Sequence, residues 1–263
     1  MLNIQQLSFG YHTTPVLQNI SFQVNPGRLC ALFGPNGSGK TTLFKCCLNF
    51  LKFNEGVVQI NGQNAQKNSV KEMAKIVAYV PQEHKSPFPY TVKEVVLMGR
   101  TPHMNGALGI KEEDKHVVVD VLEKLDILSL ANRRYNELSG GQRQMVLLAR
   151  ALTQQTELIF LDEPAASLDF KNQLLIWQVL RTLVQQGKTV FVCTHDPNHV
   201  LWFCDQVIVL NQGQIIADGQ PKHSLNEHTL QKLYGPVCDI VEMEGLNMVA
   251  PKGMRSKNEK GKM

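Results

Sequence analysis

The sequence predicts an α/β protein whose core carries an antiparallel β piece at its N-terminal side and an inserted block of helices. Three observations support this fold class. The first 25 or so residues alternate between apolar and polar side chains, as half-buried strands do. Short apolar strand patterns then alternate with helical patterns along the chain. Between about Thr91 and Thr153 the period is helical throughout, which predicts the inserted block.

The N-terminal half is predicted to contain strands, turns and one helix. The stretches LNIQQLSFGY and VLQNISFQV flank a turn at 13–15, and Pro26-Gly27 marks the next turn. The elements expected after it are a strand at Leu29–Phe33, a helix from about Lys40 to Leu51, a strand at Val57–Ile60 running into an Asn61-Gly62 turn, and a short strand at Ile76–Val80 ended by Pro81.

The helical block and the C-terminal half follow. TVKEVVLMG begins with a Thr and has a Glu three residues later, which is the capping-box pattern of a helix start. KEEDKHVVVDVLEKLDI is amphipathic, with Val117, Val121, Leu122 and Leu125 on one side. The elements expected next are a helix at Gly141–Leu152, a strand at Leu158–Leu161, a helix at Asn172–Val184, a strand at Thr189–Cys193, and a hairpin of Val207–Leu210 and Ile215–Ala217.

Composition places the chain among ordinary globular proteins. Of its 263 residues, 43% are hydrophobic and 19% are charged. No apolar run approaches the roughly 20 residues that span a bilayer, and MLNIQQLSFGY lacks the basic-then-apolar pattern of a signal peptide. The net charge of +4 comes from the tail PKGMRSKNEKGKM, and the rest of the chain is balanced. We expect this tail to be disordered, with contact to an anionic membrane surface as the alternative.

The cysteines show neither a C-x-x-C pair nor a metal-like spacing. They are Cys30, Cys46, Cys47, Cys193, Cys204 and Cys238. This usage predicts reduced and mostly buried thiols in a cytosolic protein.

The stretch LFGPNGSGKTTLF, residues 32–44, carries the strongest chemical signal. Gly34, Gly39, Lys40 and Thr41 fit the pattern G-x-x-x-x-G-K-[ST], between a predicted strand and a predicted helix. Glycine inside an element costs about 0.5–1 kcal/mol relative to Ala, but here it lets bare N–H groups wrap an anion. The positive end of the following helix points at the same phosphates. We expect Lys40 to reach the β- and γ-phosphates of a nucleotide and the Thr41 hydroxyl to bind Mg²⁺.

Candidates for the remaining chemistry stand at two strand ends. In LIFLDEP, Asp162 would hold Mg²⁺ and Glu163, one residue further, would polarise the attacking water. Acidic strand ends are common, but this pattern downstream of a phosphate loop is not. His195 ends the strand TVFVCTH and would read as structural by itself. Because parallel strands deliver their carboxyl ends to one crevice, it could contact the γ-phosphate and the attacking water.

NELSGGQRQ predicts a second helix start that could bind phosphate. Ser139, Gly140 and Gly141 offer exposed N–H groups and a hydroxyl, without a lysine. One chain hardly needs two such surfaces for one nucleotide. The economical interpretation is that this one completes the site of a second copy. The alternative is an N-capped helix with a glycine-rich turn.

Together these motifs resemble the nucleotide-binding subunit of an ATP-binding-cassette (ABC) transporter, over about residues 1–235. GPNGSGKTT is similar to the Walker A loop, LSGGQ to the signature motif and LIFLDE to the Walker B motif, in the family's order and spacing. The resemblance implies a P-loop NTPase core of ABC type at 1–235, with a helical subdomain at about 91–153 and a C-terminal extension at 236–263. It also implies hydrolysis of ATP, with Mg²⁺, coupled to transport.

Within one subunit, the resemblance implies three groups of residues around ATP. The phosphates would be bound by Gly34, Pro35, Asn36, Gly37, Ser38, Gly39, Lys40, Thr41 and Thr42. The catalytic residues would be Glu163 as the base, His195 as the switch histidine and Gln82 of the glutamine loop. Mg²⁺ would be held by Thr41, Gln82 and Asp162. Tyr11 matches the aromatic residue that stacks on adenine.

Other matching positions imply a head-to-tail pair of cassettes with two ATP molecules between them. The signature motif, which would face the opposite subunit's ATP, comprises Leu138, Ser139, Gly140, Gly141 and Gln142. The D-loop, which would cross to the opposite subunit, comprises Ser167, Leu168 and Asp169. The chain departs from the family at Ala165 and Ala166, where polar residues are more usual. Neither is a catalytic position, so the departure concerns local hydrogen bonding only.

The segment SPFPYTVKEVVLMGRTPHMN, residues 86–105, is similar to segments in importers of iron chelates, haem, cobalamin and related metal compounds. By the resemblance, its V-x-x-G-R-x-P-H motif would lie on the surface that contacts the permease coupling helix; the motif residues are Val96, Gly99, Arg100, Pro102 and His103. Taken alone, they would indicate a helix ended by a turn. Zinc, manganese and molybdate importers have similar segments, and the cargo never touches this subunit.

We therefore expect the ATP-hydrolysing subunit of a bacterial importer for an iron(III) chelate or siderophore, haem or cobalamin. Implied partners are integral-membrane permease subunits, a second ABC subunit, most simply as a homodimer, and indirectly a periplasmic or surface substrate-binding protein, but no nucleic acid. The subunit would lie peripherally on the cytoplasmic face of the cell membrane. Alternatives are a cassette of a zinc, manganese or molybdate importer, an exporter cassette, a non-hydrolysing cassette, and a soluble ABC ATPase that does not act in transport.

Overall fold

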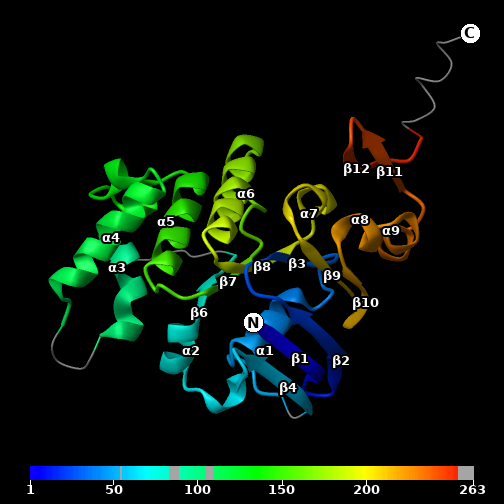
Figure 1. Ribbon diagram of the computed structural model, residues 1–263, viewed down its shortest axis with the longest axis horizontal. Coiled ribbons are helices and arrows are strands. Elements are labelled where there is room, and N and C mark those ends of the chain that lie inside the picture. The colour runs from blue at the N-terminus through cyan, green and yellow to red at the C-terminus, as the bar shows by residue number, and fades with distance from the viewer. Residues whose placement is uncertain (54, 83–88, 105–108, 254–263) are drawn as a thin grey trace, which may run out of the picture.

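A computed structural model describes residues 1–53, 55–82, 89–104 and 109–253. In this part of the chain the strands form a six-stranded sheet, a four-stranded sheet and a two-stranded hairpin (Figure 1). The predicted α/β class, with its N-terminal antiparallel piece and its helical block, is confirmed. In Figure 1 the helical block lies at one end of the molecule and the C-terminal hairpin at the other.

The antiparallel sheet has the order β2-β1-β4-β5. Its strands are β1 (Leu2–Tyr11), β2 (Thr14–Val24), β4 (Glu55–Ile60) and β5 (Gln63–Asn64). Leu2 and Ile4 of β1 are buried, because every second side chain of a strand points to the same face. The register shifts between Ile4 and Leu7, where Gln6 has a φ of 50°, and Leu7 is therefore buried as well. The predicted Asn61-Gly62 turn joins β4 to β5, and both of its residues have positive φ angles.

The six-stranded sheet positions the site and has the order β10-β9-β3-β8-β7-β6. Its strands are β3 (Leu29–Phe33), β6 (Val77–Val80), β7 (Leu158–Asp162), β8 (Thr189–Thr194), β9 (Gln206–Asn211) and β10 (Gln214–Gly219). All neighbouring pairs are parallel except β9 and β10, which form the predicted hairpin. Every residue of β3 is buried, as expected for a parallel strand covered on both faces.

The two faces of this sheet belong to different parts of the core. Leu29, Ala31 and Phe33 of β3 pack in one apolar cluster, with residues of the helical block and of the C-terminal helices. Cys30 and Leu32, which point the other way, pack with the antiparallel sheet and the first helix. The sheet is therefore the middle layer of the molecule, and its strand ends are held from both sides.

The helices of the described chain include four that the sequence analysis did not predict. Those predicted are α1 (Lys40–Cys47), α3 (Val92–Leu97), α4 (Glu112–Lys124), α5 (Gly140–Leu152) and α6 (Phe170–Gln185). Those not predicted are α2 (Val70–Ile76), α7 (Pro197–Phe203), α8 (Pro221–Ser224) and α9 (Glu227–Tyr234). A hairpin of β11 (Cys238–Met243) and β12 (Leu246–Pro251) was also not predicted.

Several predicted boundaries differ from those in the structure by one to four residues, and two of these differences have a clear local cause. The first helix ends at Cys47 and not at Leu51, because the chain turns at Asn49, which has a φ of 61°. The strand expected from Ile76 begins one residue later, because α2 occupies the residues before it. The capping box of α2, in which the side chains of Ser69 and Glu72 each bind the other's backbone N–H, is present in the sequence as S-x-x-E.

Most residues of the motif V-x-x-G-R-x-P-H are buried inside the helical block and do not lie on its surface. Val96, Gly99, Arg100 and Pro102 are buried. The side chain of Arg100 donates from Nε to Asp114 Oδ1 at 2.8 Å and from NH1 to the carbonyl oxygen of Thr153 at 2.8 Å. This ties the 3-10 helix η2 (Met98–His103) to the start of α4 and the end of α5. The motif therefore organises the block, and its contact with a permease stays a prediction.

Three further expectations concern the cysteines, the tail and the membrane. Four cysteines are buried and Cys204 and Cys238 are half-buried, and none is in a disulfide, so the expectation of mostly buried thiols is confirmed. Residues 254–263 of the basic tail, and 83–88 and 105–108 around the importer-like segment, lie outside the described residues. Within the described residues, no helix has both the length and the apolar character needed to cross a membrane.

Arg100→Met should lower the free energy of unfolding by about 3 kcal/mol, because it leaves the buried Asp114 carboxylate without its cation. The Arg100 guanidinium also holds the pKa of Asp114 below its ordinary value. Urea unfolding followed by circular dichroism measures the loss. Arg133→Met, at an exposed arginine of the same block, is the matched control and should change stability by less than about 0.5 kcal/mol. Equal effects of the two substitutions would contradict the assignment.

Candidate active site

The phosphate loop lies between β3 and α1, as predicted. Gly39 is the N-cap of α1 and has a φ of 106°, a conformation that glycine adopts without strain. The loop therefore runs directly into the helix, whose first N–H groups can bind an anion. Lys40 Nζ donates to the carbonyl oxygens of Gly34 at 2.9 Å and Pro35 at 3.2 Å, so the lysine folds back over the loop.

Parallel pairing brings the other predicted residues to the same edge of the sheet. Phe33 at the end of β3 pairs with Thr194 of β8, and Asp162 at the end of β7 pairs with Cys193 of β8. His195 and Glu163 each follow directly after these strand ends. This register places both residues at the same edge of the sheet.

Glu163 lies between the loop lysine and the histidine. Its Oε1 is 3.3 Å from Lys40 Nζ, and its Oε2 is 2.6 Å from His195 Nδ1. The lysine and the carboxylate are buried, whereas 47% of the His195 side chain is exposed. Glu163 has a φ of 51°, a conformation that is uncommon for a residue with a side chain. One carboxylate therefore joins the phosphate loop to the end of β8.

Asp162 has the surroundings of a metal ligand. It is buried, and its Oδ1 has no hydrogen-bond partner among the described residues. Burial raises the pKa of the Asp162 carboxyl, and a hydrogen bond with the Thr41 side chain opposes the rise. A nearby divalent cation would favour the charged form and occupy the unpartnered oxygen. The oxygens of Asp162, Thr41 and Gln82 are the kind of ligands that Mg²⁺ prefers, so this set fits the ion.

A cavity of about 350 Å³ is shared by the phosphate loop and the residues that face it. Its lining comprises Val16, Asn36, Gly37, Gly39, Lys40, Thr41, Thr42, Gln82 and Glu163. Gln82 reaches it from the end of β6, which pairs in parallel with β7. The cavity therefore brings together the phosphate-binding, acidic and glutamine-loop residues that the sequence analysis grouped around ATP.

Tyr11 is not brought into this cavity. It lies at the end of β1 with 44% of its surface exposed, and its ring meets that of Phe9 edge-on at 5.0 Å. The antiparallel sheet nevertheless reaches the phosphate loop through β2, because Val16 belongs to the cavity lining. Stacking of adenine on Tyr11 stays a prediction.

The signature motif forms the capped start of α5, away from the phosphate-loop cavity of its own chain. The Ser139 hydroxyl accepts from the N–H of Gln142 at 3.3 Å, and the Gln142 side chain accepts from the N–H of Ser139 at 3.1 Å. A side chain at Gly141 would collide with the amide of Asn172 at 2.6 Å. Glycine there lets α5 pack closely on the start of α6, next to the D-loop.

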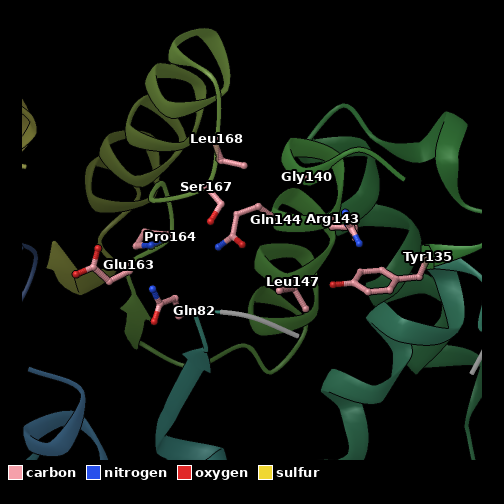
Figure 2. A pocket seen from close by; sticks show the side chains of 10 residues that line it. All are labelled: Gln82, Tyr135, Gly140, Arg143, Gln144, Leu147, Glu163, Pro164, Ser167 and Leu168. Carbon is pink, nitrogen blue, oxygen red and sulfur yellow. The ribbon is translucent and has the colours of Figure 1, made fainter. Parts of the chain in front are cut away.

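A second cavity, of about 150 Å³, lies between α5, the D-loop and Gln82 (Figure 2). Figure 2 shows Gln144 on α5, with Ser167, Gln82 and Glu163 on the facing side. Gln144 is buried, and its amide nitrogen has no hydrogen-bond partner in the described structure. The sequence analysis did not select Gln144, although it lies on the helix that follows LSGGQ.

The D-loop follows the two alanines that depart from the family pattern. The N–H of Ala166 donates to the carbonyl oxygen of Glu163 at 3.2 Å. The side chain of Gln173 donates to the carbonyl oxygens of Ala165 at 3.3 Å and Leu168 at 3.0 Å. Backbone groups and one glutamine thus hold this turn without polar side chains at the two alanines.

The arrangement defines a nucleoside-triphosphate hydrolase of the phosphate-loop class, with its lysine at the start of α1 and its acidic pair and histidine at the ends of the neighbouring parallel strands β7 and β8. A family model described as ABC transporter matches residues 17–166. The chain is 36% identical over 241 residues to the iron(3+)-hydroxamate import ATP-binding protein FhuC of Bacillus subtilis (strain 168), covering 91% of this chain and 90% of the relative. The chain belongs to the ABC transporter family and is one of its ATP-binding, ATP-hydrolysing subunits.

Two further comparisons agree with this assignment. The manganese transport system ATP-binding protein MntA of a Synechocystis strain is 36% identical over 247 residues, covering 92% of this chain and 94% of the relative. A chain in a solved inward-facing structure of a metal-chelate type ABC transporter superposes with a TM-score of 0.84 at 32% identity, covering 95% of this chain and 96% of that one. The whole cassette, and not only its motifs, is therefore shared.

Lys40→Ala should weaken ATP binding by about 10- to 100-fold, because the variant loses a charge-assisted hydrogen bond to phosphate worth about 1.5–3 kcal/mol. Titration with a fluorescent ATP analogue measures the dissociation constant, and melting without nucleotide checks the fold. Lys45→Ala, at an exposed lysine on the same helix, is the matched control and should bind as the wild type does. An unchanged affinity in a folded Lys40→Ala protein would mean that the lysine has another role.

Proposed function

We propose that the protein energises a bacterial ABC importer by hydrolysing ATP between two cassettes. The observation that carries the hydrolytic part is the position of Glu163, whose carboxylate lies within 3.3 Å of Lys40 and 2.6 Å of His195. A carboxylate at this position is placed to accept a proton next to a bound γ-phosphate.

In the proposed reaction, the phosphate loop and Lys40 bind the β- and γ-phosphates. Glu163 accepts a proton from a water molecule as that water attacks the γ-phosphorus. The bond from the γ-phosphorus to the bridging oxygen breaks, and ADP and inorganic phosphate leave. His195 contacts the γ-phosphate and helps to hold the attacking water. The protein contributes chiefly position and charge, which is what phosphoryl transfer requires.

Mg²⁺ would be held by Asp162, Thr41 and Gln82, and when bound it would neutralise charge on the phosphates. The unpartnered Oδ1 of buried Asp162 supports this assignment. Adenine would stack on Tyr11. The catalytic unit would comprise residues 1–235, and the residues after it would form an extension.

The proposed working form is a head-to-tail homodimer. Support comes from the separation of two helix starts that could bind phosphate, those of α1 and α5. The residues of LSGGQ, at the start of α5, do not line the phosphate-loop cavity at the start of α1 in the described chain. A second copy would place its signature motif over the bound ATP, and its D-loop would follow. The dimer would lie at the cytoplasmic face of the membrane, against permease subunits, and these permease subunits would receive cargo from a substrate-binding protein.

For the cargo we propose a metal chelate, namely an iron(III) chelate or siderophore, haem or cobalamin. Support comes from the relative named for iron(3+)-hydroxamate import and from the metal-chelate type transporter structure. Manganese is the second candidate, because the relative named for manganese transport is equally identical at 36%.

Isolation of the intact complex tests the importer proposal. The tagged chain is purified from gently solubilised native membranes, and its partners are identified by mass spectrometry. A many-helix permease in equal amount is the expected result. Uptake of radioactive iron chelate or of manganese by cells with and without the gene then separates the two cargoes. A chain that purifies with ribosomes or nucleic acid would contradict the proposal.

Glu163→Gln should reduce ATP hydrolysis by roughly 10²- to 10⁴-fold while ATP binding persists, because the amide cannot accept the proton. ATP should then hold two copies together, which size-exclusion chromatography with light scattering detects. Glu157→Gln, at an exposed position before β7, is the control and should keep wild-type hydrolysis. If Glu163→Gln stays monomeric at saturating ATP, the sandwich proposal is wrong.

A further inference from the structure

The C-terminal hairpin of β11 and β12 is hydrogen-bonded to α7, the helix that begins two residues after His195. The N–H of Val249 donates to Asn198 Oδ1 at 2.7 Å, and Asn198 Nδ2 donates to the carbonyl oxygen of Val249 at 3.3 Å. Trp202 Nε1 donates to the carbonyl oxygen of Asn247 at 3.1 Å. Two side chains of α7 thus bind the backbone of β12 along the edge that does not pair with β11. In Figure 1 this hairpin stands above α8 and α9, at the α7 end of the core.

These bonds matter because neither partner is stable alone. A two-stranded hairpin is marginal in water, and α7, with seven residues, is too short to persist as an isolated helix. The inner side of α7 is held by His199, which is buried and lies 5.4 Å from the Trp177 ring. The outer side is held by the hairpin. The position of α7 therefore depends on contacts from both directions.

His195 is joined to α7 through a single residue. Asp196 caps the helix, because its Oδ1 accepts from the N–H groups of Asn198 at 2.8 Å and His199 at 3.2 Å. Tyr234, at the end of α9, donates its hydroxyl to the carbonyl oxygen of His195 at 3.5 Å. The His195 side chain is half exposed, so few side-chain contacts hold it. The position of its imidazole next to Glu163 therefore depends on the backbone at residues 195 and 196.

We propose that the C-terminal hairpin is a positioning element for ATP hydrolysis, and that Asn198 and Trp202 are the positioning residues through which it holds His195 in place against Glu163. This rests on the proposed function, in which His195 and Glu163 act on ATP. The hairpin contacts neither the phosphate loop nor Lys40 in the described bonds, so it should affect the hydrolytic step and leave ATP affinity unchanged. A displacement of about 1 Å at a reacting group is enough to lower a rate severely.

Steady-state ATPase measurements on the full chain with Mg²⁺ test this proposal. Asn198→Ala combined with Trp202→Phe removes the three hydrogen bonds and keeps the apolar ring. A second variant ends at Gly235 and lacks the hairpin. The matched control ends at Gly253 and lacks only the basic tail. We expect kcat to fall about tenfold in the first two variants and to stay within twofold in the control. KM and the affinity for a non-hydrolysable ATP analogue should stay within twofold in all of them.

The same changes in a His195→Ala background show whether the hairpin acts through this histidine. Residues that work as one unit are not additive, so the further loss there should be less than twofold. An equal tenfold loss in that background, or an unchanged kcat in the otherwise wild-type chain, overturns the inference. If the shortened chain does not melt cooperatively, the double substitution alone decides. If His195→Ala hydrolyses ATP at the wild-type rate, the proposed role of His195 is wrong and the hairpin proposal falls with it. If His195→Ala is slow but the hairpin variants are not, only the hairpin proposal is wrong.

Discussion

The parallel pairing of β3, β8 and β7 is the constraint on which the rest of the site depends. Phe33 lies opposite Thr194 and Asp162 lies opposite Cys193, so the residues just beyond these pairs emerge side by side. Shifting one strand by a single residue would turn its side chains to the other face of the sheet. Both faces are covered by apolar clusters, and such a shift would bury the wrong side chains on each. The packing of the core thus fixes the geometry of the chemistry.

Glu163 shows what this constraint makes possible. Its backbone leaves the strand with a φ of 51°, a conformation that costs of order 1–3 kcal/mol, and its N–H is held by the carbonyl oxygen of Cys193 at 3.2 Å. The turn brings its carboxylate between Lys40 and His195 instead of along β7. A phosphate that binds Lys40 competes with Glu163 for the same ammonium group. Binding of nucleotide therefore changes the surroundings of the proposed base directly.

The predictable part of this molecule is the part with strong local signals. The strand, glycine loop and helix of LFGPNGSGKTTLF were predicted in order, because glycines and a buried apolar run have few other uses together. Helix α2 was not predicted, although the pattern S-x-x-E indicates its start. Its seven residues are too few to show a clear helical period of apolar side chains. Arg100 was assigned to a surface because the resemblance implies that its motif contacts the permease coupling helix. Its burial depends on Asp114 and on the end of α5, which are distant in sequence. The hairpin was missed for the same reason, since its partners on α7 lie about 50 residues upstream.

The signature motif and the D-loop pack against each other within one chain. Gly140 lies against Leu168, and Gly141 lies against Asn172, whose side chain donates to Asp169 at 2.8 Å. Gly141 permits a close approach that a side chain would prevent, whereas a Cβ at Gly140 would make an ordinary contact with Leu168 at 3.7 Å. The start of α5 and the start of α6 therefore form one surface, separate from the phosphate-loop cavity of the same chain. A second copy that covers this chain's ATP with its signature motif has to bring its D-loop to the same place. In the proposed dimer, the packing inside one subunit would thus determine which two motifs reach the other subunit's ATP together.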